Sequence, residues 1–295
     1  MQLQRQVDHL RSQGLGLAAI SYDAPEILAA FSERYGITFP LLSDVGSRTI
    51  AAYGILNTVA DEALGAGEDD PAIAAEVKKY VSVSGSRDTA IITKGTPFPG
   101  TFVVDREGHV TARDFETFYR ERTTASTVML RLGVGAAPIA ATKMSRDDVE
   151  ITTYPADPTV SPGSRTALVV HVAPRPRMHV YAQGASGYRP VRLAIAPDPL
   201  VRVLPLAYPA SEMYLFEPLN ERVPVYQRPF TLAQEVVLEV TPEAERAFRG
   251  RPEVTLNGTL EYQACDDKMC FNPAAVPLSW TLKVTPNITE RIRQQ

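Results

Sequence analysis

The sequence predicts a protein of two domains, an α/β layered domain followed by an all-β sandwich. A chain of 295 residues is long enough for two domains of ordinary size. Helical and strand patterns alternate up to about residue 135, as in α/β layered domains. After about residue 145 the helical pattern disappears, and short strands follow, separated by Pro, Gly and Asn. We therefore expect a first domain over 1–135, a linker over 136–145 and a second domain over 146–288.

The first domain is expected to begin with a helix, because Leu3, Val7 and Leu10 fall on one helical face. A buried apolar strand is expected next, and then a helix that begins with Asp23 as its N-cap and ends at Gly36. That strand is expected within 14–23. The later elements are expected to be an extended segment over 37–44, a short helix over 46–54, an insertion over 56–80, two strands and a turn within 96–116, and a helix over 116–132.

The second domain is expected to consist of strands alone. The segment ALVVHVA (167–173) alternates only partly and is assigned to a core strand. Further strands are expected in 149–174, 179–184, 189–197, 201–209, 229–242, 252–264 and 275–286. A spacing of about ten residues between strands is typical of a β-sandwich.

Composition excludes several classes of function. The formal net charge is −4 and no basic block occurs, which argues against binding of nucleic acid. No run approaches the roughly 18 apolar residues of a membrane span, and the N-terminus lacks the pattern of a secretory signal. The glycine and serine motifs of hydrolases and nucleotide-binding enzymes do not occur.

The two cysteines of the chain, Cys265 and Cys270, stand in the segment EYQACDDKMCFNP (261–273). Strands are expected on both sides of them, so a hairpin with the loop 266–269 would place the cysteines opposite each other. Directly opposed residues lie close enough for a disulfide without movement of the backbone. A structural staple across so small a loop would stabilise the fold by roughly 2 kcal/mol.

A metal site and a redox pair are the other interpretations of the two cysteines. A structural zinc needs four ligands, and this spacing supplies only two, so a metal site is the weakest interpretation. A redox pair requires an accessible thiolate, which a loop tip offers. Asp266 and Asp267 would raise the thiol pKa, whereas Lys268 would lower it. From these arguments a staple and a redox pair stay equally open.

The segment around the cysteines resembles the N-terminal periplasmic domain of DsbD, the transmembrane thiol:disulfide interchange protein. The spacing between the cysteines is one residue longer in some members of that family. The resemblance spans about 145–286, including MHVYAQG at 178–184, and the matching residues are Tyr262, Gln263, Cys265, Cys270, Pro273, Val276 and Pro277. It implies an immunoglobulin-like sandwich in the periplasm whose catalytic cysteines take electrons from a thioredoxin-like donor and pass them to a client disulfide protein.

In the DsbD family, a loop with aromatic and acidic residues covers the cysteines. The matching segment here is 211–226, in which Tyr214, Phe216 and Glu217 are candidates for the loop tip. The alternative is that Tyr214 and Phe216 are core residues of an ordinary strand. Tyr181 and Tyr262 are further candidates for lining the site, although Tyr181 also suits a packed core.

The first domain resembles redoxins, the peroxiredoxins of the AhpC/TSA type and their thioredoxin-like relatives, over about 1–132. LAAISYDAPEILAAFSERYGITFPLLSD (17–44) and PGTFVVDREGHV (99–110) carry the resemblance. It implies a thioredoxin-like α/β fold in which Pro99 is a cis proline facing the catalytic site; the alternative is a trans proline in a turn, because cis bonds are uncommon even before proline. The strand and cysteine that open a redoxin have no counterpart after Met1, so we expect a gap in the sheet, no thiol chemistry in this domain as given, and a reading frame that extends upstream.

Together these observations predict thiol:disulfide exchange through Cys265 and Cys270 in a fusion of a redoxin and a DsbD-like domain. No metal and no cofactor is expected, and no membrane span lies in the chain. The alternative is a non-catalytic binding or structural protein, with a degenerate redoxin domain and a static hairpin disulfide. The redox potential of the cysteine pair would separate the two.

Overall fold

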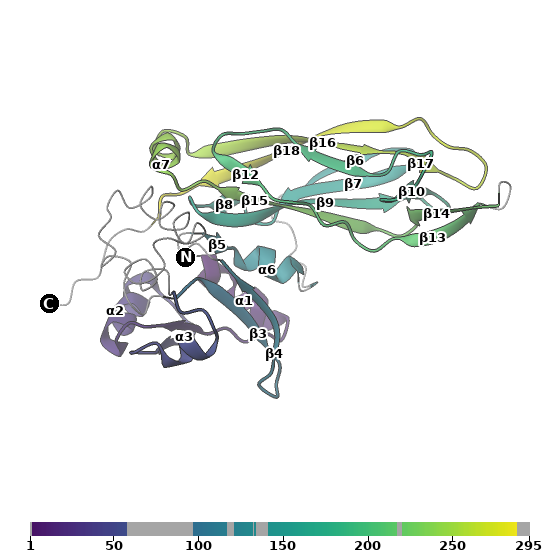
Figure 1. Cartoon of the computed structure of the whole chain (residues 1–295). Coiled ribbons are helices and arrows are strands. Elements are labelled where there is room, and N and C mark those ends of the chain that lie inside the picture. The colour runs from purple at the N-terminus through teal and green to yellow at the C-terminus, as the bar shows by residue number, and fades with distance from the viewer. Residues whose placement is uncertain are drawn as a thin grey trace, which may run out of the picture.

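The computed structural model of the chain describes residues 2–57, 97–116, 121–131, 133, 141–216 and 220–287. These residues form mostly β-structure with few helices. An elongated β-sandwich (the sandwich, residues 141–287) makes up most of the molecule, and a smaller N-terminal unit (residues 2–57 and 97–116) lies against one end of it (Figure 1). No helix in the described ranges combines the length and the apolar character needed to cross a membrane.

The N-terminal unit contains two separate pairs of strands. Strands β1 and β2 are parallel, whereas β3 and β4 form an antiparallel hairpin, and no ladder joins the two pairs among the described residues. The elements are α1 (Gln2–Ser12), β1 (Ala19–Ser21), α2 (Pro25–Tyr35), β2 (Leu41–Ser43), α3 (Arg48–Ala52), β3 (Gly100–Val104) and β4 (Val110–Phe115). The gap that the sequence predicts in this sheet stays a prediction.

The helices of the N-terminal unit follow the sequence pattern closely. Helix α1 buries Val7 and Leu10, two of the three apolar residues assigned to its inner face. Helix α2 ends at Gly36, whose positive φ of 60° is the left-handed conformation that glycine adopts easily. Its N-cap is Ala24 and not Asp23, because the Asp23 carboxylate instead accepts a hydrogen bond from the Ser21 hydroxyl.

Strand β1 is less buried than the sequence predicts. Ile20 is 44% exposed, and Leu42 on the neighbouring strand β2 is exposed to a similar extent. The expectation of a buried apolar strand was therefore wrong. The physical reason is that a sheet of only two strands leaves much of its surface uncovered.

A short strand and a helix connect the N-terminal unit to the sandwich. The helix expected over 116–132 begins only at Ala125, as α6 (Ala125–Arg131), because residues 122–123 form strand β5 (Arg122–Thr123). Strand β5 pairs in parallel with β9 (Ser164–Pro174) of the sandwich. Helix α1 packs on α6, and α6 packs on β9, so the N-terminal unit and the sandwich are in direct contact.

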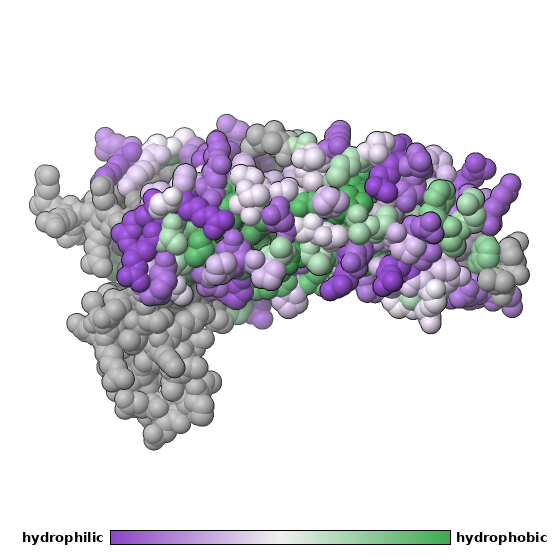
Figure 2. Space-filling model, turned by 90° about the horizontal axis from the view of Figure 1, so that it is seen from above, coloured by the Kyte–Doolittle hydropathy of each residue, from purple (hydrophilic) through white to green (hydrophobic). Residues whose placement is uncertain are grey.

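The sandwich is built from two sheets that enclose one apolar core. Strand β18 buries alternate residues along its whole length, and the partly alternating strand β9 buries Leu168 and Val170 as expected. One sheet has the order β12 (Val201–Val203), β15 (Phe230–Leu238), β9, β7 (Val149–Pro155) and β6 (Thr142–Ser145). The facing sheet has the order β11 (Arg192–Ile195), β16 (Glu253–Tyr262), β18 (Ala274–Val284) and β8 (Thr159–Val160). From above, a band of apolar side chains runs along the middle of the molecule between polar side chains (Figure 2).

Two elements of the sandwich lie at positions that the sequence pattern did not predict. Strand β6 falls within 136–145, the predicted linker, and pairs with β7. The helix α7 (Pro242–Arg249) interrupts the strands that were expected alone. Its N-cap is Thr241, whose side chain accepts a hydrogen bond from the Ala244 N–H at 3.2 Å. The domain boundaries at 135 and 146 stay predictions.

A third sheet closes one end of the sandwich. Its order is β13 (Glu212–Phe216), β14 (Glu221–Tyr226), β10 (His179–Tyr181) and β17 (Ala264–Cys265). Figure 1 places these strands at the end of the sandwich that is remote from the N-terminal unit. Strand β17 brings Cys265 into this end sheet.

Candidate functional site

The two cysteines form a disulfide at the end sheet. Cys265 and Cys270 face each other across an antiparallel bridge, with their Cα atoms 4.0 Å apart. The loop between them is held by Asp266, whose carboxylate oxygen accepts the N–H groups of Lys268 and Met269 at 2.7 Å each. These two backbone donors lower the pKa of Asp266. The hairpin that the spacing made feasible is therefore present.

The two sulfur-bearing residues differ sharply in exposure. Cys265, the last residue of strand β17, is buried, with 2% of its surface exposed. Cys270 belongs to the exposed side of the loop. A protein that approaches the disulfide from solvent therefore meets Cys270 before Cys265.

Tyr181 contacts both sulfur atoms from the floor of the site. Its hydroxyl lies 3.1 Å from the Cys265 Sγ and 3.5 Å from the Cys270 Sγ. The ring stacks on Tyr188 with the centroids 4.0 Å apart, and the Tyr188 hydroxyl donates to a Glu221 carboxylate oxygen at 2.8 Å. Burial, reinforced by Tyr188, raises the pKa of Tyr181, so its hydroxyl keeps its proton and remains a donor.

Strand register places a histidine beside the buried sulfur. His179 on β10 pairs directly with Cys265 on β17, so their side chains leave the sheet on the same face. The ring of His179 lies 4.5 Å from the Tyr214 ring and 5.4 Å from the Tyr181 ring, measured between centroids. Burial lowers the pKa of His179, and the carboxylates of Asp267 and Asp266 oppose this effect.

A small hollow of about 60 Å³ opens beside the disulfide. Both cysteines line it, so a ligand or partner group that enters the hollow meets the sulfur atoms directly. Aromatic side chains from three strands or loops form most of its wall. Apart from the cysteines, its main lining residues are His179, Tyr181, Tyr188, Tyr214, Phe216, Lys268 and Met269.

The structure brings three of the predicted lining residues to this hollow. Tyr181 lies on β10, whereas Tyr214 and Phe216 lie on β13 with half-buried side chains that face the site. Both interpretations of 211–226 thus hold in part, because these aromatic residues belong to a regular strand and still cover the disulfide. Glu217 falls outside the described residues.

Two predicted site residues lie elsewhere. Tyr262 is fully buried in the main core, and its hydroxyl bonds to an Asp148 carboxylate oxygen at 3.1 Å. It is not among the residues that line the hollow, because its side chain points into the sandwich. Pro99 lies in the N-terminal unit and follows a trans peptide bond, so the expected cis proline was wrong. Its carbonyl accepts the Glu116 N–H at 2.9 Å, as part of the β3–β4 hairpin.

Sequence reasoning missed His179 and Tyr188. A signal for His179 existed, because residues two apart on a strand share a face, and the segment HVY therefore places His179 beside Tyr181. Tyr188 comes from a loop and reaches the site only through tertiary packing. No periodicity in the sequence predicts that contact.

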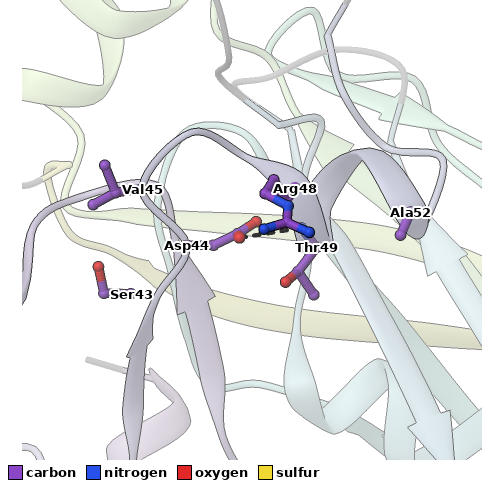
Figure 3. Close-up of a pocket in the computed structure, with 6 residues that line it drawn as sticks. All are labelled: Ser43, Asp44, Val45, Arg48, Thr49 and Ala52. Atoms are coloured by element: carbon purple, nitrogen blue, oxygen red, sulfur yellow. Dashed lines mark hydrogen bonds between the residues drawn. The ribbon is translucent and has the colours of Figure 1, made fainter.

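A second, shallower hollow of about 490 Å³ lies in the N-terminal unit. Figure 3 shows the Asp44 carboxylate turned toward Arg48 and Thr49 at the start of α3. It accepts the N–H groups of Thr49 and Ile50 at 3.1 and 2.8 Å, and the Ile50 donor is the main cause of the lowered pKa of Asp44. The carboxylate thus serves the fold of α3. Within the described ranges, no group of three or more metal-ligating side chains occurs.

Comparison with known families assigns a separate match to each half of the chain. The model of the AhpC/TSA family matches residues 1–113. The model named thiol:disulfide interchange protein DsbD, N-terminal, matches residues 151–277. Both resemblances that the sequence motifs indicated are thereby confirmed. All cysteines of the chain lie in the second match, so residues 1–113 contain no thiol.

Individual relatives cover only parts of the chain. Proteins from two strains of Mycobacterium tuberculosis, each named as a proposed peroxiredoxin, are 49% identical over 41 residues. This stretch is 14% of the present chain and 26% of those proteins, so the chain spans about a quarter of the curated relatives it matches.

Two solved structures are similar to part of the chain. The reduced DsbD N-terminal domain of Neisseria meningitidis has 16% identity and a TM-score of 0.27, covering 38% of this chain and 74% of that one. The N-terminal periplasmic domain of ScsB from Proteus mirabilis has 15% identity and a TM-score of 0.34, covering 49% of this chain and 50% of that one.

Proposed function

We propose that this protein carries out thiol–disulfide exchange through Cys265 and Cys270. The observation that carries the proposal is the asymmetry of the disulfide, with one sulfur-bearing residue at the surface and the other buried. A static staple needs no such arrangement. An exchange reaction requires this asymmetry, because a partner must reach one sulfur while the other sulfur resolves the mixed disulfide. The match to the DsbD N-terminal family supports the same chemistry.

The exposed sulfur is the point of attack in this mechanism. A donor thiolate attacks the Cys270 Sγ, the bond between Cys270 and Cys265 breaks, and its electron pair leaves on the Cys265 Sγ. The donor and Cys270 are then joined by a mixed disulfide. A second donor thiol resolves that bond and leaves both cysteines reduced. The Tyr181 hydroxyl, 3.1 Å from the Cys265 sulfur, is placed to donate a hydrogen bond to the departing thiolate.

The reduced pair then passes its two electrons to a client. The Cys270 thiolate attacks the client disulfide and releases one client sulfur. The Cys265 thiolate next attacks the Cys270 Sγ, re-forms the original disulfide and frees the second client sulfur. A thioredoxin-like electron donor and a client disulfide protein are the partners that this cycle requires. An oxidising compartment such as the periplasm suits a protein that rests as a disulfide.

The β13–β14 hairpin serves as the cover of the site in this proposal. Tyr214 and Phe216 face the disulfide from β13 and narrow the hollow. A small reductant must pass these rings to reach Cys265, whereas Cys270 remains open to a partner. The N-terminal unit, with its match to redoxins, is proposed to have a thioredoxin-like fold, and the sandwich an immunoglobulin-like one.

The redox potential of the disulfide tests the proposed function. Equilibration of the protein with glutathione buffers, followed by mass spectrometry of the alkylated thiols, gives that potential. Working oxidoreductases lie at roughly −120 to −270 mV, and structural disulfides lie below about −300 mV. A potential below about −300 mV would contradict exchange as the function.

Trapping of a mixed disulfide identifies the sulfur that is attacked. The variant Cys265→Ser keeps the exposed Cys270 and removes the resolving thiol, so a covalent complex with a donor or with oxidised glutathione should accumulate. The matched variant Cys270→Ser keeps only the buried thiol and should trap little complex. Equal trapping by both variants would contradict attack at Cys270.

A non-catalytic binding or structural protein with a static disulfide is the second candidate. The observation that favours it is the lack of any cysteine in residues 1–113, the part that matches redoxins. Under this interpretation the potential falls below about −300 mV, and neither serine variant traps a partner.

A further inference from the structure

A buried histidine lies next to the sulfur that leaves during exchange, and the mechanism above does not use it. His179 is 3% exposed and pairs with Cys265 in the register of β10 and β17. Side chains of directly opposed residues on one face of an antiparallel pair have Cβ atoms about 4.5–5.5 Å apart. The imidazole and both sulfur atoms also line the same hollow.

The imidazole of His179 packs against two tyrosine rings. Tyr214 packs against one side of it, and the Tyr181 ring meets it edge-on at an interplanar angle of 90°. Among the described residues, no hydrogen bond or ion pair involves its ring nitrogens. A buried imidazole is usually hydrogen-bonded, because unpaired polar atoms are costly in the interior. His179 lines the hollow, where its ring nitrogens have no such partner among the described residues.

The Cys265 sulfur, which leaves when the disulfide opens, requires a nearby group that can donate a proton. When the disulfide opens, Cys265 receives a negative charge at a position that is almost fully buried. A buried thiolate is unfavourable unless it is paired or takes up a proton. The Tyr181 hydroxyl can donate a hydrogen bond but keeps its own proton, because burial raises its pKa. A proton donor that titrates near neutral pH is therefore still required, and histidine is the side chain of that kind.

We propose that His179 carries the proton that the Cys265 sulfur takes up when the disulfide opens and gives back when it closes. This inference rests on the proposed function of exchange at Cys270 and Cys265. In the opening step, the electron pair of the broken bond goes to the Cys265 Sγ, and an imidazolium N–H passes its proton to that thiolate. The neutral imidazole then takes a proton from water that enters the hollow.

The closing step runs in the opposite direction. The neutral imidazole accepts the proton of the Cys265 thiol, and the thiolate attacks the Cys270 Sγ in the mixed disulfide with the client. The electron pair of that disulfide leaves on the client sulfur. Two electrons have then moved from the cysteine pair to the client, and the imidazolium returns its proton to water.

Several other titratable or charged groups face His179. Asp266 and Asp267 follow Cys265 on the loop and favour the protonated imidazole, and Lys268 of the same loop lines the hollow with His179. On the aromatic side, Tyr181, Tyr188 and Tyr214 line the hollow, and the Glu221 carboxylate accepts a hydrogen bond from the Tyr188 hydroxyl. Burial lowers the pKa of His179 and favours the neutral imidazole, the base of the closing step, whereas the two carboxylates favour the imidazolium, the acid of the opening step.

Histidine titration by NMR in the oxidised and reduced protein tests the inference without a variant. The pKa of His179 should rise by about one unit on reduction under conditions where the Cys265 thiolate forms, because an adjacent anion favours the imidazolium. His171 is the internal control, since it lies on β9 and its Nδ1 is 3.1 Å from the Thr231 hydroxyl. A pKa of His179 that is the same in both redox states would overturn the inference.

The variant His179→Gln provides a kinetic test with dithiothreitol as the reductant. At pH 7 its disulfide should be reduced roughly three- to tenfold more slowly, because the leaving thiolate loses its proton donor. After correction for the thiolate fraction of dithiothreitol, the wild-type rate should still follow a titration near or below pH 6.5, and the variant rate should not. The matched control His171→Gln should leave both the rate and the pH profile unchanged.

The outcomes separate this inference from the function on which it rests. If His179→Gln is folded and keeps the wild-type rate and pH profile, His179 has no role in proton transfer, although exchange stands. If the wild-type potential is that of a static disulfide, the proposed function fails first. If the variant is unfolded, the NMR titration of the wild-type protein alone decides the question.

Discussion

At the scale of single residues, the two cysteines have identical chemistry and unlike surroundings. Cys265 is buried next to the Tyr181 hydroxyl and opposite His179 on β10, whereas Cys270 lies on the open side of the loop. In the proposed exchange, these surroundings decide which sulfur is attacked and which one leaves. A leaving thiolate departs faster when its surroundings lower its pKa, and Tyr181 is the nearest hydrogen-bond donor to it.

The variant Tyr181→Phe tests the role of that hydroxyl. It removes the hydrogen bond to the Cys265 sulfur but keeps an aromatic ring to stack on Tyr188. Because a thiolate loses a donor, we expect the pKa of Cys265 in the reduced protein to rise by roughly one unit. The rate of reduction by dithiothreitol should fall by about threefold. Titration of the thiolate absorbance and stopped-flow kinetics measure the two effects.

Tyr226→Phe is the matched control for that variant. Tyr226 is also buried, on the neighbouring strand β14, but its hydroxyl donates to the Pro209 carbonyl at 2.8 Å and not to sulfur. Its loss should lower the free energy of unfolding by about 1 kcal/mol and leave the thiol pKa unchanged. If Tyr181→Phe and Tyr226→Phe change the pKa of the Cys265 thiol equally, Tyr181 acts on that thiol through packing and not through its hydroxyl.

At the scale of elements, β13 presents two different faces to its surroundings. Tyr214 and Phe216 face the disulfide, while Met213 and Leu215 are exposed on the other side of the strand. Alternation along one strand thus separates a face that lines the hollow from a face exposed to solvent. Neighbouring residues of β13 therefore face opposite sides, so variants of them can be compared within one strand.

The pair Phe216→Ala and Leu215→Ala tests β13 as a cover. Removal of the Phe216 ring widens the hollow, so a small reductant should reach the disulfide about two- to fivefold faster. Leu215→Ala removes a side chain from the opposite face and should leave the rate unchanged. Each truncation should cost about 1 kcal/mol of unfolding free energy or less, because both side chains are partly exposed. Equal rates for both variants would show that β13 does not limit access.

The elements predicted best from the sequence are those with a clear local signal. The apolar spacing of α1, the glycine at the end of α2 and the alternation of β18 act within one element, and the structure contains all three. Helix α7 was missed although Thr241 and Pro242 are a typical helix start, because the surrounding strand pattern dominated the interpretation. The exposure of Ile20 on β1 depends on which strands lie beside it, and a local pattern does not contain that information.

The residues of the candidate site likewise divide into those that a local signal in the sequence predicts and those that it does not. The disulfide and the aromatic residues of β13 were predictable, because the spacing of the cysteines and the family resemblance both mark short segments. The placement of Tyr262 was wrong, since its position next to the cysteine motif does not reveal that its side chain points into the core. Tyr188 and the pairing of His179 with Cys265 required strand register and loop packing, which arise only in the folded chain.

At the scale of the whole molecule, a network of ion pairs fixes the N-terminal unit to the sandwich. Glu235 on β15 accepts two hydrogen bonds from Arg131 at 2.7 Å and one from Arg165, also at 2.7 Å. Arg131 also contacts Asp114, and Arg165 contacts Glu116, both in or next to β4. This network lies at the end of the sandwich where β5 and α6 attach, remote from the end sheet with the disulfide (Figure 1).

The variant Glu235→Gln tests whether the attachment and the disulfide act independently. It removes the charge that both arginines share, so the free energy of unfolding should fall by about 1–3 kcal/mol, and less at high salt, because the pairs are partly buried. The rate of reduction by dithiothreitol should not change, because the network and the disulfide lie at opposite ends of the sandwich. Urea denaturation and the reduction kinetics of the same sample measure both quantities. Glu150→Gln, which breaks an exposed pair with Arg175, should cost less than about 1 kcal/mol. A change of the reduction rate in Glu235→Gln alone would instead show that docking of the N-terminal unit is coupled to the disulfide through the strands of the sandwich.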